Sequence, residues 1–436
     1  MPTKVINKCC VCGHTDLKPI LSLGEQPLSS VFPGSDSPDP SVSPLELIRC
    51  NNQSKPDACG VVQLRHLADV TEMYGTTYGY SSSVSPTMVS HLEEMVHRLT
   101  GVAKPASGDI VLDIGCNDGT TLNAYGADSG LVRIGMDPSS RKFSSHFQPG
   151  IQVLYDFFSE KGVRSMIGDR QCRIVTSIAM FYDIDDPMEF MRQIRAILAP
   201  DGVWALELSY LPLLLTQLTY DQICHEHVTY FGLTHMDWMM KRVGLRILDV
   251  SFNDVNGGSF FILAGQDGGP YQPNKAAIRK ILDSEKPLST DAPFERLKNR
   301  VLAHRDEVRH FFELTRAAGK RVYGYGASTK GNIVMNYCGV KEGDLIAIGD
   351  RSPEKDGLVT PGTRIPIISH AKLRQLNPDY LFVLIWPFRK EVICDEIDYL
   401  NRGGKMVFHL PRLHVVDKDN YQRYLDTSFE DLAYSL

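Results

Sequence analysis

Two histidines flank a glutamate in the stretch Tyr220–Phe231, which is rich in polar side chains. The imidazoles of His225 and His227 titrate near neutral pH, and the carboxylate of Glu226 can orient an imidazole or raise its basicity. This pattern predicts a general base, with Cys224 beside it in the site. The spacing differs from H-E-x-x-H, so a zinc-protease helix is not indicated. A metal site on the two histidines, or imidazoles hydrogen-bonded at a domain interface, are the alternatives.

A second group of residues has metal-binding chemistry and lies near the N-terminus. Cys9 and Cys12 are separated by two residues, so two thiolates can reach one ion from a single turn. Cys50 and Cys59 supply a second pair, although the usual separation is only about two to four residues. We predict a structural Zn²⁺ on these four ligands, with no open position for chemistry. Cys10 is then spare or competes for the first position, and reduced structural thiols are the alternative.

A glycine-rich turn has the form Asp113-x-Gly115-x-x-x-Gly119, which differs from the G-x-G-x-x-G of dinucleotide sites. Gly115 lets the backbone approach a ligand closely, and Gly119 lets the next helix pack nearby. Asp137 ends the next expected strand, where a carboxylate suits the two hydroxyls of a ribose. Together with Asn117 in the turn, these residues predict a pocket for S-adenosyl-L-methionine (SAM). A glycine turn used for packing alone is the alternative.

Two further positions are expected to face this pocket. Asp156, followed by Phe157 and Phe158, comes after the third expected strand and is placed to cover an adenine. Tyr182 follows the fourth strand, where cofactor and substrate should meet. Packing of these aromatic side chains in the core is the alternative.

The elements that position these residues alternate between strand and helix from about residue 70 to residue 268. Buried strands are expected at Gly108–Ile114, Leu131–Asp137, Arg173–Ile178 and Gly202–Leu208. This alternation predicts a parallel, doubly wound sheet. Two further runs, Leu245–Val250 and Phe260–Ala264, flank a turn at Asn256–Gly258 and predict an antiparallel hairpin.

The chain is predicted to be an α/β protein of three domains. They are a small zinc-binding domain (1–66), a Rossmann-like SAM methyltransferase domain (67–268) and a smaller C-terminal Rossmann-like α/β domain (269–436). A loop is expected at Ser30–Pro44 in the first of them. In the last region we expect a helix at about Pro293–Ala318 and strands at Arg321–Tyr325, Leu345–Asp350 and Tyr380–Ile385. Its turn Gly324-x-Gly326 is a second nucleotide-type turn, which makes an NAD-dependent oxidoreductase an alternative.

The composition excludes several classes of protein. A formal net charge of -6, without a Lys/Arg-dense stripe, argues against nucleic acid as a partner. The apolar runs are too short to span a bilayer, and the first residues lack the apolar core of a secretory signal. We therefore expect a cytoplasmic protein without a membrane partner, in which the 10 cysteines are thiols or metal ligands.

The order of these motifs resembles the nucleotide-sugar C-methyltransferases, the enzymes that make branched deoxysugars such as mycarose and tetronitrose. The resemblance covers essentially the whole chain. It rests on the four cysteines, Tyr78-Gly-Tyr80-Ser81-Ser82-Ser83, the Asp113–Gly119 turn, Glu226-His227, and the C-terminal stretches Tyr323–Asn332 and Asp350–Lys355.

The resemblance implies a zinc-binding N-terminal domain, a central SAM domain and a C-terminal domain that helps to hold a nucleotide-sugar. It implies active-site roles for Glu226, for His227, and for Tyr78 or Tyr80. Such enzymes often have a tyrosine two residues before the glutamate, where this chain has Cys224. Implied or plausible contacts to the nucleotide-sugar are Ser328, Lys330 and Asn332, together with Asn256 and Ser259 of the hairpin turn.

The expected reaction is SAM-dependent methylation at C-3 of a nucleotide-linked 4-keto-6-deoxy sugar through an enolate. His227 is the expected base, Glu226 would hold its imidazole, and Tyr78 or Tyr80 would face the oxyanion. The alternatives are an O- or N-methyltransferase and a nucleotide-sugar-binding protein without turnover. The sequence leaves open the nucleotide, the sugar and which of its carbons is methylated, the stereochemistry and the oligomeric state.

Overall fold

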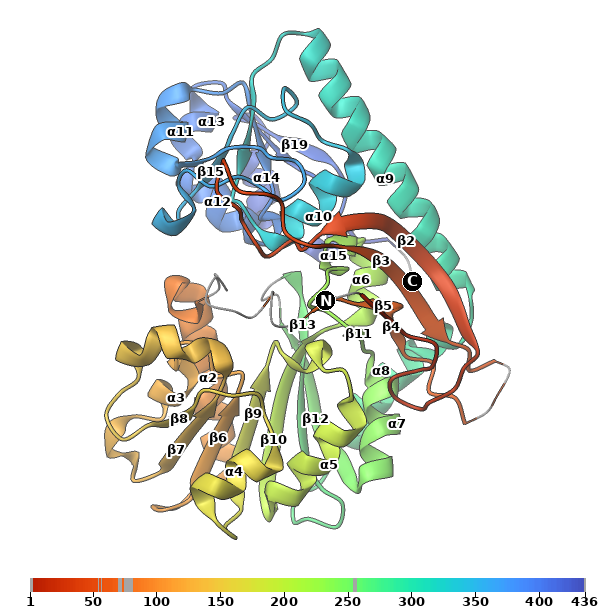
Figure 1. The fold of residues 1–436 in the computed structure, drawn as a ribbon, viewed down its shortest axis with the longest axis vertical. Coiled ribbons are helices and arrows are strands. Elements are labelled where there is room, and N and C mark those ends of the chain that lie inside the picture. The colour runs from red at the N-terminus through yellow and green to blue at the C-terminus, as the bar shows by residue number, and fades with distance from the viewer. Residues whose placement is uncertain are drawn as a thin grey trace.

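Two α/β units face each other, and an N-terminal β hairpin runs along one side of both (Figure 1). The structure is a computed structural model that describes residues 3–434 apart from positions 54, 56, 70–72, 74–80 and 254–256. No helix within these ranges is long and apolar enough to cross a membrane. The predicted mixture of α/β units with a small N-terminal region is confirmed.

The first unit is built on a seven-stranded sheet. Its strands are β6 (Ile110–Ile114), β7 (Val132–Met136), β8 (Gln152–Leu154), β9 (Cys172–Ile178), β10 (Leu198–Ser209), β12 (Leu245–Asn253) and β13 (Ser259–Gln266). The spatial order is β12-β13-β10-β9-β6-β7-β8, and only β13 runs antiparallel to its neighbours. The predicted parallel sheet and the predicted hairpin are therefore confirmed, and the carboxyl ends of β6 and β9 mark the switch point of the topology.

Helices cover both faces of this sheet because the strands are apolar on both sides. They are α2 (Pro86–Ala103), α3 (Thr120–Ala124), α4 (Glu160–Ile167), α5 (Pro187–Ile197), α7 (Leu233–Val243) and α8 (Lys275–Ser284). The helix that follows β10, α6 (Leu211–Gln217), packs instead in the hydrophobic cluster of the second unit. In β10, Trp204 and Leu206 pack in the core shared with α5 and α7, whereas Val203 and Ala205 pack in the core shared with α2. α8 packs on α7 and β12.

The second unit has a six-stranded sheet in the order β16-β15-β14-β17-β18-β19, in which only β19 is antiparallel. Its strands are β14 (Val322–Tyr325), β15 (Ile348–Asp350), β16 (Ile367–Ser369), β17 (Tyr380–Val383), β18 (Lys405–Phe408) and β19 (His414–Val416). Its helices are α9 (Ala292–Ala317), α10 (Thr329–Cys338), α11 (His370–Leu376), α12 (Arg389–Asp395), α13 (Ile397–Asn401), α14 (Tyr421–Asp426) and α15 (Phe429–Leu432). The predicted Rossmann-like arrangement is confirmed, with its switch point between β14 and β17.

The N-terminal region, residues 3–69, is called the zinc module below. Its strands are β1 (Lys4–Val5), β2 (Leu17–Pro27), β3 (Val42–Cys50), β4 (Val62–Leu64) and β5 (His66–Leu67). β1 and β5 form a two-stranded sheet, and a strand from the first unit, β11 (Thr229–Tyr230), joins the other three in the sheet β11-β4-β3-β2. The predicted loop Ser30–Pro44 is shorter than expected, because β3 begins at Val42 and pairs with β2 in a long hairpin.

Candidate active site and metal centre

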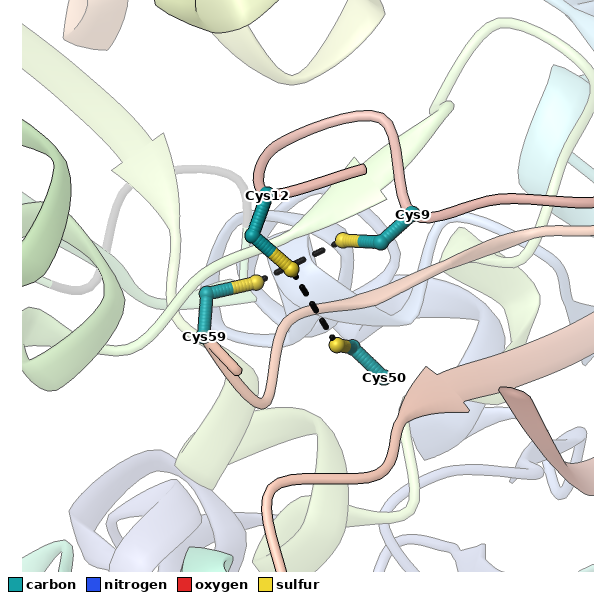
Figure 2. Close-up of side chains that lie close together, drawn as sticks. All are labelled: Cys9, Cys12, Cys50 and Cys59. Atoms are coloured by element: carbon teal, nitrogen blue, oxygen red, sulfur yellow. Dashed lines mark hydrogen bonds between the residues drawn. The ribbon is translucent and has the colours of Figure 1, made fainter. Parts of the chain in front are cut away.

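Four cysteine side chains converge between the N-terminal turn, the end of β3 and the loop before β4 (Figure 2). Their Sγ atoms all lie within 4.8 Å of one another, and the pairs Cys9–Cys59 and Cys12–Cys50 are 3.4 Å apart. A tetrahedral Zn²⁺ with Zn–S bonds of about 2.3 Å needs sulfurs about 3.8 Å apart. The donor set therefore fits a structural Zn²⁺, and four thiolates leave no position open for a substrate.

Two glycine-ended turns bring these ligands together. The N–H of Gly13 donates to the carbonyl of Cys9 at 2.9 Å, and Gly13 has a φ of 75° that favours glycine. Gly60, which follows the last ligand, also has a φ of 75°. Cys10 lies outside the ligand set, and its backbone N–H donates to Gln63 Oε1 at 2.9 Å. Cys10, which is not a metal ligand, therefore connects the turn between Cys9 and Cys12 to β4 through its backbone N–H.

A side chain at either glycine of the turn after β6 would collide with a neighbouring side chain. Gly115 has a φ of 73°, and a Cβ there would lie 3.0 Å from Met180 Cγ. Gly119 has a φ of 82°, and a Cβ there would lie 2.6 Å from the ring of Phe147. Both positions therefore require glycine. The backbone of the turn can approach a ligand at the switch point, as predicted for the SAM pocket.

Three carboxylates border this turn: Asp113, Asp118 and Asp137. Asp137 follows β7 and accepts the N–H of Asn117 at 2.9 Å. Asp113 is only 3% exposed, and burial raises its pKa to about 7, while the hydroxyl of Thr176 donates to it at 2.5 Å. An acidic surround suits SAM, which carries positive charge on its sulfonium and its ammonium group.

Asp118 connects this turn to the serine stretch before α2. Its carboxylate accepts the hydroxyl of Ser81 at 2.7 Å and the N–H of Ser83 at 2.8 Å. Burial raises the pKa of Asp118, but hydrogen bonds from the hydroxyl of Thr120 and then from Ser83 and Ser81 outweigh it and hold the pKa below its usual value. Tyr78 and Tyr80, the predicted active-site tyrosines, lie outside the described residues. Sequence reasoning missed Asp118, whose only local signal is its place inside the glycine turn.

The aromatic pair after β8 divides between surface and core. Asp156 is exposed, and its carboxylate accepts the N–H of Phe157 within its own turn at 2.8 Å. Phe158 packs against Phe190 with ring centroids 4.7 Å apart. Phe158 therefore takes the packing role that was the alternative to covering an adenine, whereas Asp156 stays a prediction.

His227 lines a hollow beside the carboxyl end of β10. The hollow is also bordered by Ser209, Tyr182 and Tyr230, and the ring of Tyr182 lies 4.3 Å from the imidazole between centroids. Burial lowers the pKa of His227 to about 3, and the charge of Lys330 lowers it further in the same direction. The imidazole is therefore neutral at physiological pH, with a lone pair available to accept a proton.

Glu226 does not hold the imidazole of His227, contrary to the prediction. Within the described ranges no hydrogen bond joins the two, and Glu226 Oε2 is buried without a partner. Glu226 instead acts electrostatically on His225. Burial lowers the pKa of His225, and the charge of Glu226 opposes that shift. Cys224 is 2% exposed, and burial raises the pKa of its thiol. Cys224 therefore packs as a small apolar side chain.

The second unit repeats the strand–turn–helix geometry of the first. Gly326 has a φ of 84°, and a Cβ there would lie 2.6 Å from the side chain of Ile385. Asp350 ends β15 and accepts the N–H of Ala327 at 2.7 Å. Ser328 caps α10 with its hydroxyl, so it is oriented by the helix end. Phosphate binding near the start of α10 stays a prediction.

The other predicted nucleotide-sugar contacts differ in their surroundings. Lys330 is half-buried in the first turn of α10, on the side of the first unit. Asn332 is fully buried, and its amide donates to the carbonyl of Ser29 at 2.8 Å, so it joins the second unit to the zinc module. Ser259 is buried at the start of β13. Asn256 lies outside the described residues.

The two units meet close to His227. Trp386, which follows β17, donates from Nε1 to Asp221 Oδ2 at 2.7 Å. Gly257 at the tip of the β12–β13 hairpin approaches the same indole, and a Cβ there would lie 3.1 Å from it. Burial raises the pKa of Asp221, and Lys330 opposes that effect. The carboxyl ends of both sheets therefore face a common region that contains His227.

A buried ion pair at the end of β10 escaped sequence reasoning. Glu207 accepts from His91 Nε2 at 2.9 Å and from the amide of Asn253 at 2.7 Å. The pairing with Glu207 raises the pKa of His91 against the effect of burial. These three residues come from α2, β10 and β12, so no local spacing in the sequence could have indicated them.

Solved structures resemble part of the chain. The PH0226 protein from Pyrococcus horikoshii OT3 shares 16% identity and a TM-score of 0.34, covering 43% of this chain and 95% of that chain. The CcbJ methyltransferase from Streptomyces caelestis shares 13% identity and a TM-score of 0.32, covering 44% of this chain and 94% of that chain.

Sequence comparison covers nearly the whole chain. Three family models match in succession: "Putative zinc binding domain" at 9–74, "Methyltransferase domain" at 88–250 and "C-methyltransferase C-terminal domain" at 254–411. The C-methyltransferase NovU from Streptomyces niveus is 28% identical over 420 residues, which are 95% of this chain and 98% of that protein. The four-cysteine cluster and the glycine turn lie inside the matching regions. The chain therefore carries, in order, the three domains of a zinc-containing, SAM-dependent C-methyltransferase, and it is similar to one such enzyme over 95% of its length.

Proposed function

We propose that the protein transfers the methyl group of SAM to C-3 of a nucleoside-diphosphate 4-keto-6-deoxy sugar, through an enolate. The observation that carries this proposal is the half-buried, neutral imidazole of His227, which lines a hollow in the first unit and feels the charge of Lys330 from the second unit. Bound SAM supplies an electrophilic methyl group, so the nucleophile has to form on the sugar carbon. A ketone next to that carbon makes its proton removable.

In this proposal His227 takes the proton from C-3, and the hydroxyl of Tyr78 or Tyr80 faces the developing oxyanion. The neutral state of His227 supports the first role. Ser81, the residue that follows Tyr80 in the sequence, donates its hydroxyl to Asp118 in the SAM turn, and this bond supports the second role. Correct placement of the reacting groups is worth an effective molarity of roughly 10⁵ M and above.

The nucleotide part of the substrate is proposed to bind the second unit. Lys330 offers a cation beside the capped start of α10, where Ser328 and the turn at Gly326 surround an anion site. The hairpin turn Asn256–Ser259 would then approach the sugar. The proposed setting is the cytoplasm, where reducing conditions keep the metal-binding cysteines as thiolates.

The direct test incubates the purified protein with SAM and a panel of nucleoside-diphosphate 4-keto-6-deoxyhexoses. Mass spectrometry then follows the sugar and S-adenosylhomocysteine. One carbon-bound methyl group on a panel member, with stoichiometric S-adenosylhomocysteine, supports the proposal and identifies the nucleotide. Methyl transfer to oxygen or nitrogen would overturn it.

The enolate makes a separate prediction. Incubation of the accepted sugar with enzyme in D₂O, without SAM, should exchange the proton on C-3 for deuterium. O- or N-methylation needs no such exchange. Methyl transfer without any exchange at C-3 would therefore count against the enolate.

The role of the base is tested with His227→Ala. A positioned general base is worth about 10²- to 10⁴-fold in rate, so turnover should fall by about that factor while SAM affinity is retained. His97→Ala, which changes an exposed histidine on α2, is the matched control and should leave turnover unchanged. Unchanged turnover in His227→Ala would remove His227 from the mechanism.

A further inference from the structure

The strand that follows His227 belongs to the sheet of the zinc module. β11 pairs antiparallel with β4, so that Thr229 lies opposite Gln63 and Tyr230 lies opposite Val62. In addition, the N–H of Leu64 donates to the carbonyl of Val228 at 2.8 Å. The backbone directly after the base is therefore fixed by the N-terminal region of the chain, and not by the sheet that binds SAM.

A side chain fixes the same loop on the other side of the base. His225 is 1% exposed, and its Nε2 donates to the carbonyl of Ser43 on β3 at 3.0 Å. The segment from His225 to Val228 has no regular secondary structure of its own. Two hydrogen bonds to the zinc module therefore flank Glu226 and His227, and a third bond within the loop runs from the N–H of His227 to the carbonyl of Cys224 at 3.2 Å.

The two metal turns are in turn bonded to the strand that holds β11. Cys10, between the first two ligands, donates its N–H to the side chain of Gln63 at 2.9 Å. Ligand Cys50 donates its N–H to the carbonyl of Val61 at 2.9 Å. Only two residues separate ligand Cys59 from β4. Movement of the metal turns would therefore displace β4, and with it β11.

The other side of the loop contacts the first unit. The hydroxyl of Thr229 donates to the carbonyl of Tyr182 at 3.2 Å, and the ring of Tyr182 contacts the imidazole of His227. The N–H of Leu211 donates to the carbonyl of Phe231 at 2.9 Å. The base is thus held between the zinc module and the hollow.

We propose that the zinc module positions the catalytic base: bound Zn²⁺ fixes β4, and β4 together with Ser43 holds residues 225–228 in place. His225 is a positioning residue in this arrangement and touches no reacting atom. The inference rests on the proposed role of His227. It requires no open coordination position, since the metal acts only through the geometry of its ligands.

The first experiment uses the zinc-loaded enzyme and the pair His225→Leu and His225→Gln. The leucine removes the donor to Ser43, and the glutamine keeps a donor at a similar distance from the backbone. Because a displacement of 1 Å can cost about 10²-fold, turnover in His225→Leu should fall by about 10- to 100-fold. His225→Gln should recover most of it, and His97→Leu serves as the matched control.

Hydrogen–deuterium exchange supplies the readout that does not depend on activity. In His225→Leu, exchange should accelerate in a peptide that covers residues 224–231 and stay unchanged over residues 113–119. Zinc content and SAM affinity should match the parent enzyme. Unchanged exchange at 224–231, or an equal loss of protection at both peptides, would overturn the proposal.

Metal removal tests the same idea without a substitution. Treatment with 1,10-phenanthroline should accelerate exchange at 224–231 and leave SAM affinity within about twofold, and added Zn²⁺ should reverse both the exchange and the loss of turnover. Protection of 224–231 that survives zinc removal would overturn the proposal. If instead His227→Ala kept full turnover, the proposed role of His227 as the base would be wrong. The exchange measurement would still show whether the zinc module holds residues 225–228 in place.

Discussion

The two glycine turns of the molecule have the same backbone design and different charges. In each, a carboxylate at the end of the neighbouring strand accepts an N–H of the turn: Asp137 from Asn117 at 2.9 Å, and Asp350 from Ala327 at 2.7 Å. In each, a glycine with positive φ lies at the switch point of a Rossmann-like sheet, where a Cβ would collide with a neighbouring side chain. Backbone geometry alone would therefore give the two turns the same class of ligand.

Side-chain charge separates them. Asp113 and Asp118 lie beside the first turn, whereas Lys330 and Lys355 lie beside the second, where Lys355 donates to the carbonyl of Ala327 at 2.7 Å. An acidic surround favours the cationic SAM, and a basic surround favours the diphosphate of a nucleotide-sugar. The two turns therefore share one backbone geometry, and the charge of the surrounding side chains selects the ligand that each turn binds.

The largest loss of ligand affinity should come from adding a side chain to the glycine turn of the first unit. Gly119→Ala places a Cβ 2.6 Å from the ring of Phe147 at a φ of 82°. A left-handed alanine alone costs roughly 1–2 kcal/mol, and the turn should relieve this strain by leaving its SAM-binding geometry, so SAM affinity should fall by about 5- to 30-fold in calorimetry. Gly101→Ala, in α2 with open space around it, is the matched control. An equal loss of nucleotide-sugar affinity in Gly119→Ala would break the comparison.

Removing the cation beside the second glycine turn should have a smaller effect. Lys330→Ala should weaken nucleotide-sugar binding by about tenfold, or about 1.4 kcal/mol, because a charge-assisted contact to phosphate is lost. SAM affinity should stay within error. Lys341→Ala, an exposed lysine of the same unit, is the control. Equal weakening of both ligands would mean that Lys330 does not distinguish the two turns.

The features predicted well from the sequence are local. The turn at Asp113–Gly119 needs only a strand, two glycines and a helix start, all within a dozen residues. The metal site follows from short cysteine spacings, and its long insertion between Cys50 and Cys59 leaves the ligands in place. Even the helix expected at about Pro293–Ala318 is found at Ala292–Ala317, because its apolar spacing is regular.

The features that escaped prediction depend on which distant segments meet. Glu226 was expected to hold His227, but the turn at residues 225–226 directs it elsewhere, and a pattern of adjacent residues cannot reveal that direction. The pairing of β11 with β4 joins segments far apart in the chain. The strands β18 and β19 and the pair His91–Glu207 depend on similar long-range contacts.

The charge of Lys330, beside the second glycine turn, should also influence the pKa of His227 in the first unit. Burial and the charge of Lys330 lower the pKa of His227 to about 3, against an ordinary value of about 6.5. In the free enzyme kcat/KM should therefore show no inflection near pH 6.5 that belongs to His227. Lys330→Met should raise the pKa of His227, as should binding of a diphosphate that pairs with Lys330. Histidine NMR measures both shifts, and an unchanged pKa would show that the two turns are electrostatically independent.

The smallest effect concerns the acidic surround itself. Burial raises the pKa of Asp113 to about 7, so this carboxyl is partly protonated at neutral pH. The sulfonium of SAM favours the ionised form, so binding should lower the pKa of Asp113, and affinity should rise with pH until the carboxyl is fully ionised.

If SAM lowers this pKa by about one unit, its affinity should be about fivefold weaker at pH 6 than at pH 8. Calorimetry with S-adenosylhomocysteine is the sharpest control, because its thioether lacks the positive sulfur and should show a weaker pH dependence. Asp113→Asn should remove the dependence for SAM altogether. If SAM and S-adenosylhomocysteine responded to pH alike, the charge of Asp113 would not contribute to the choice of ligand, and the first turn would select SAM by shape.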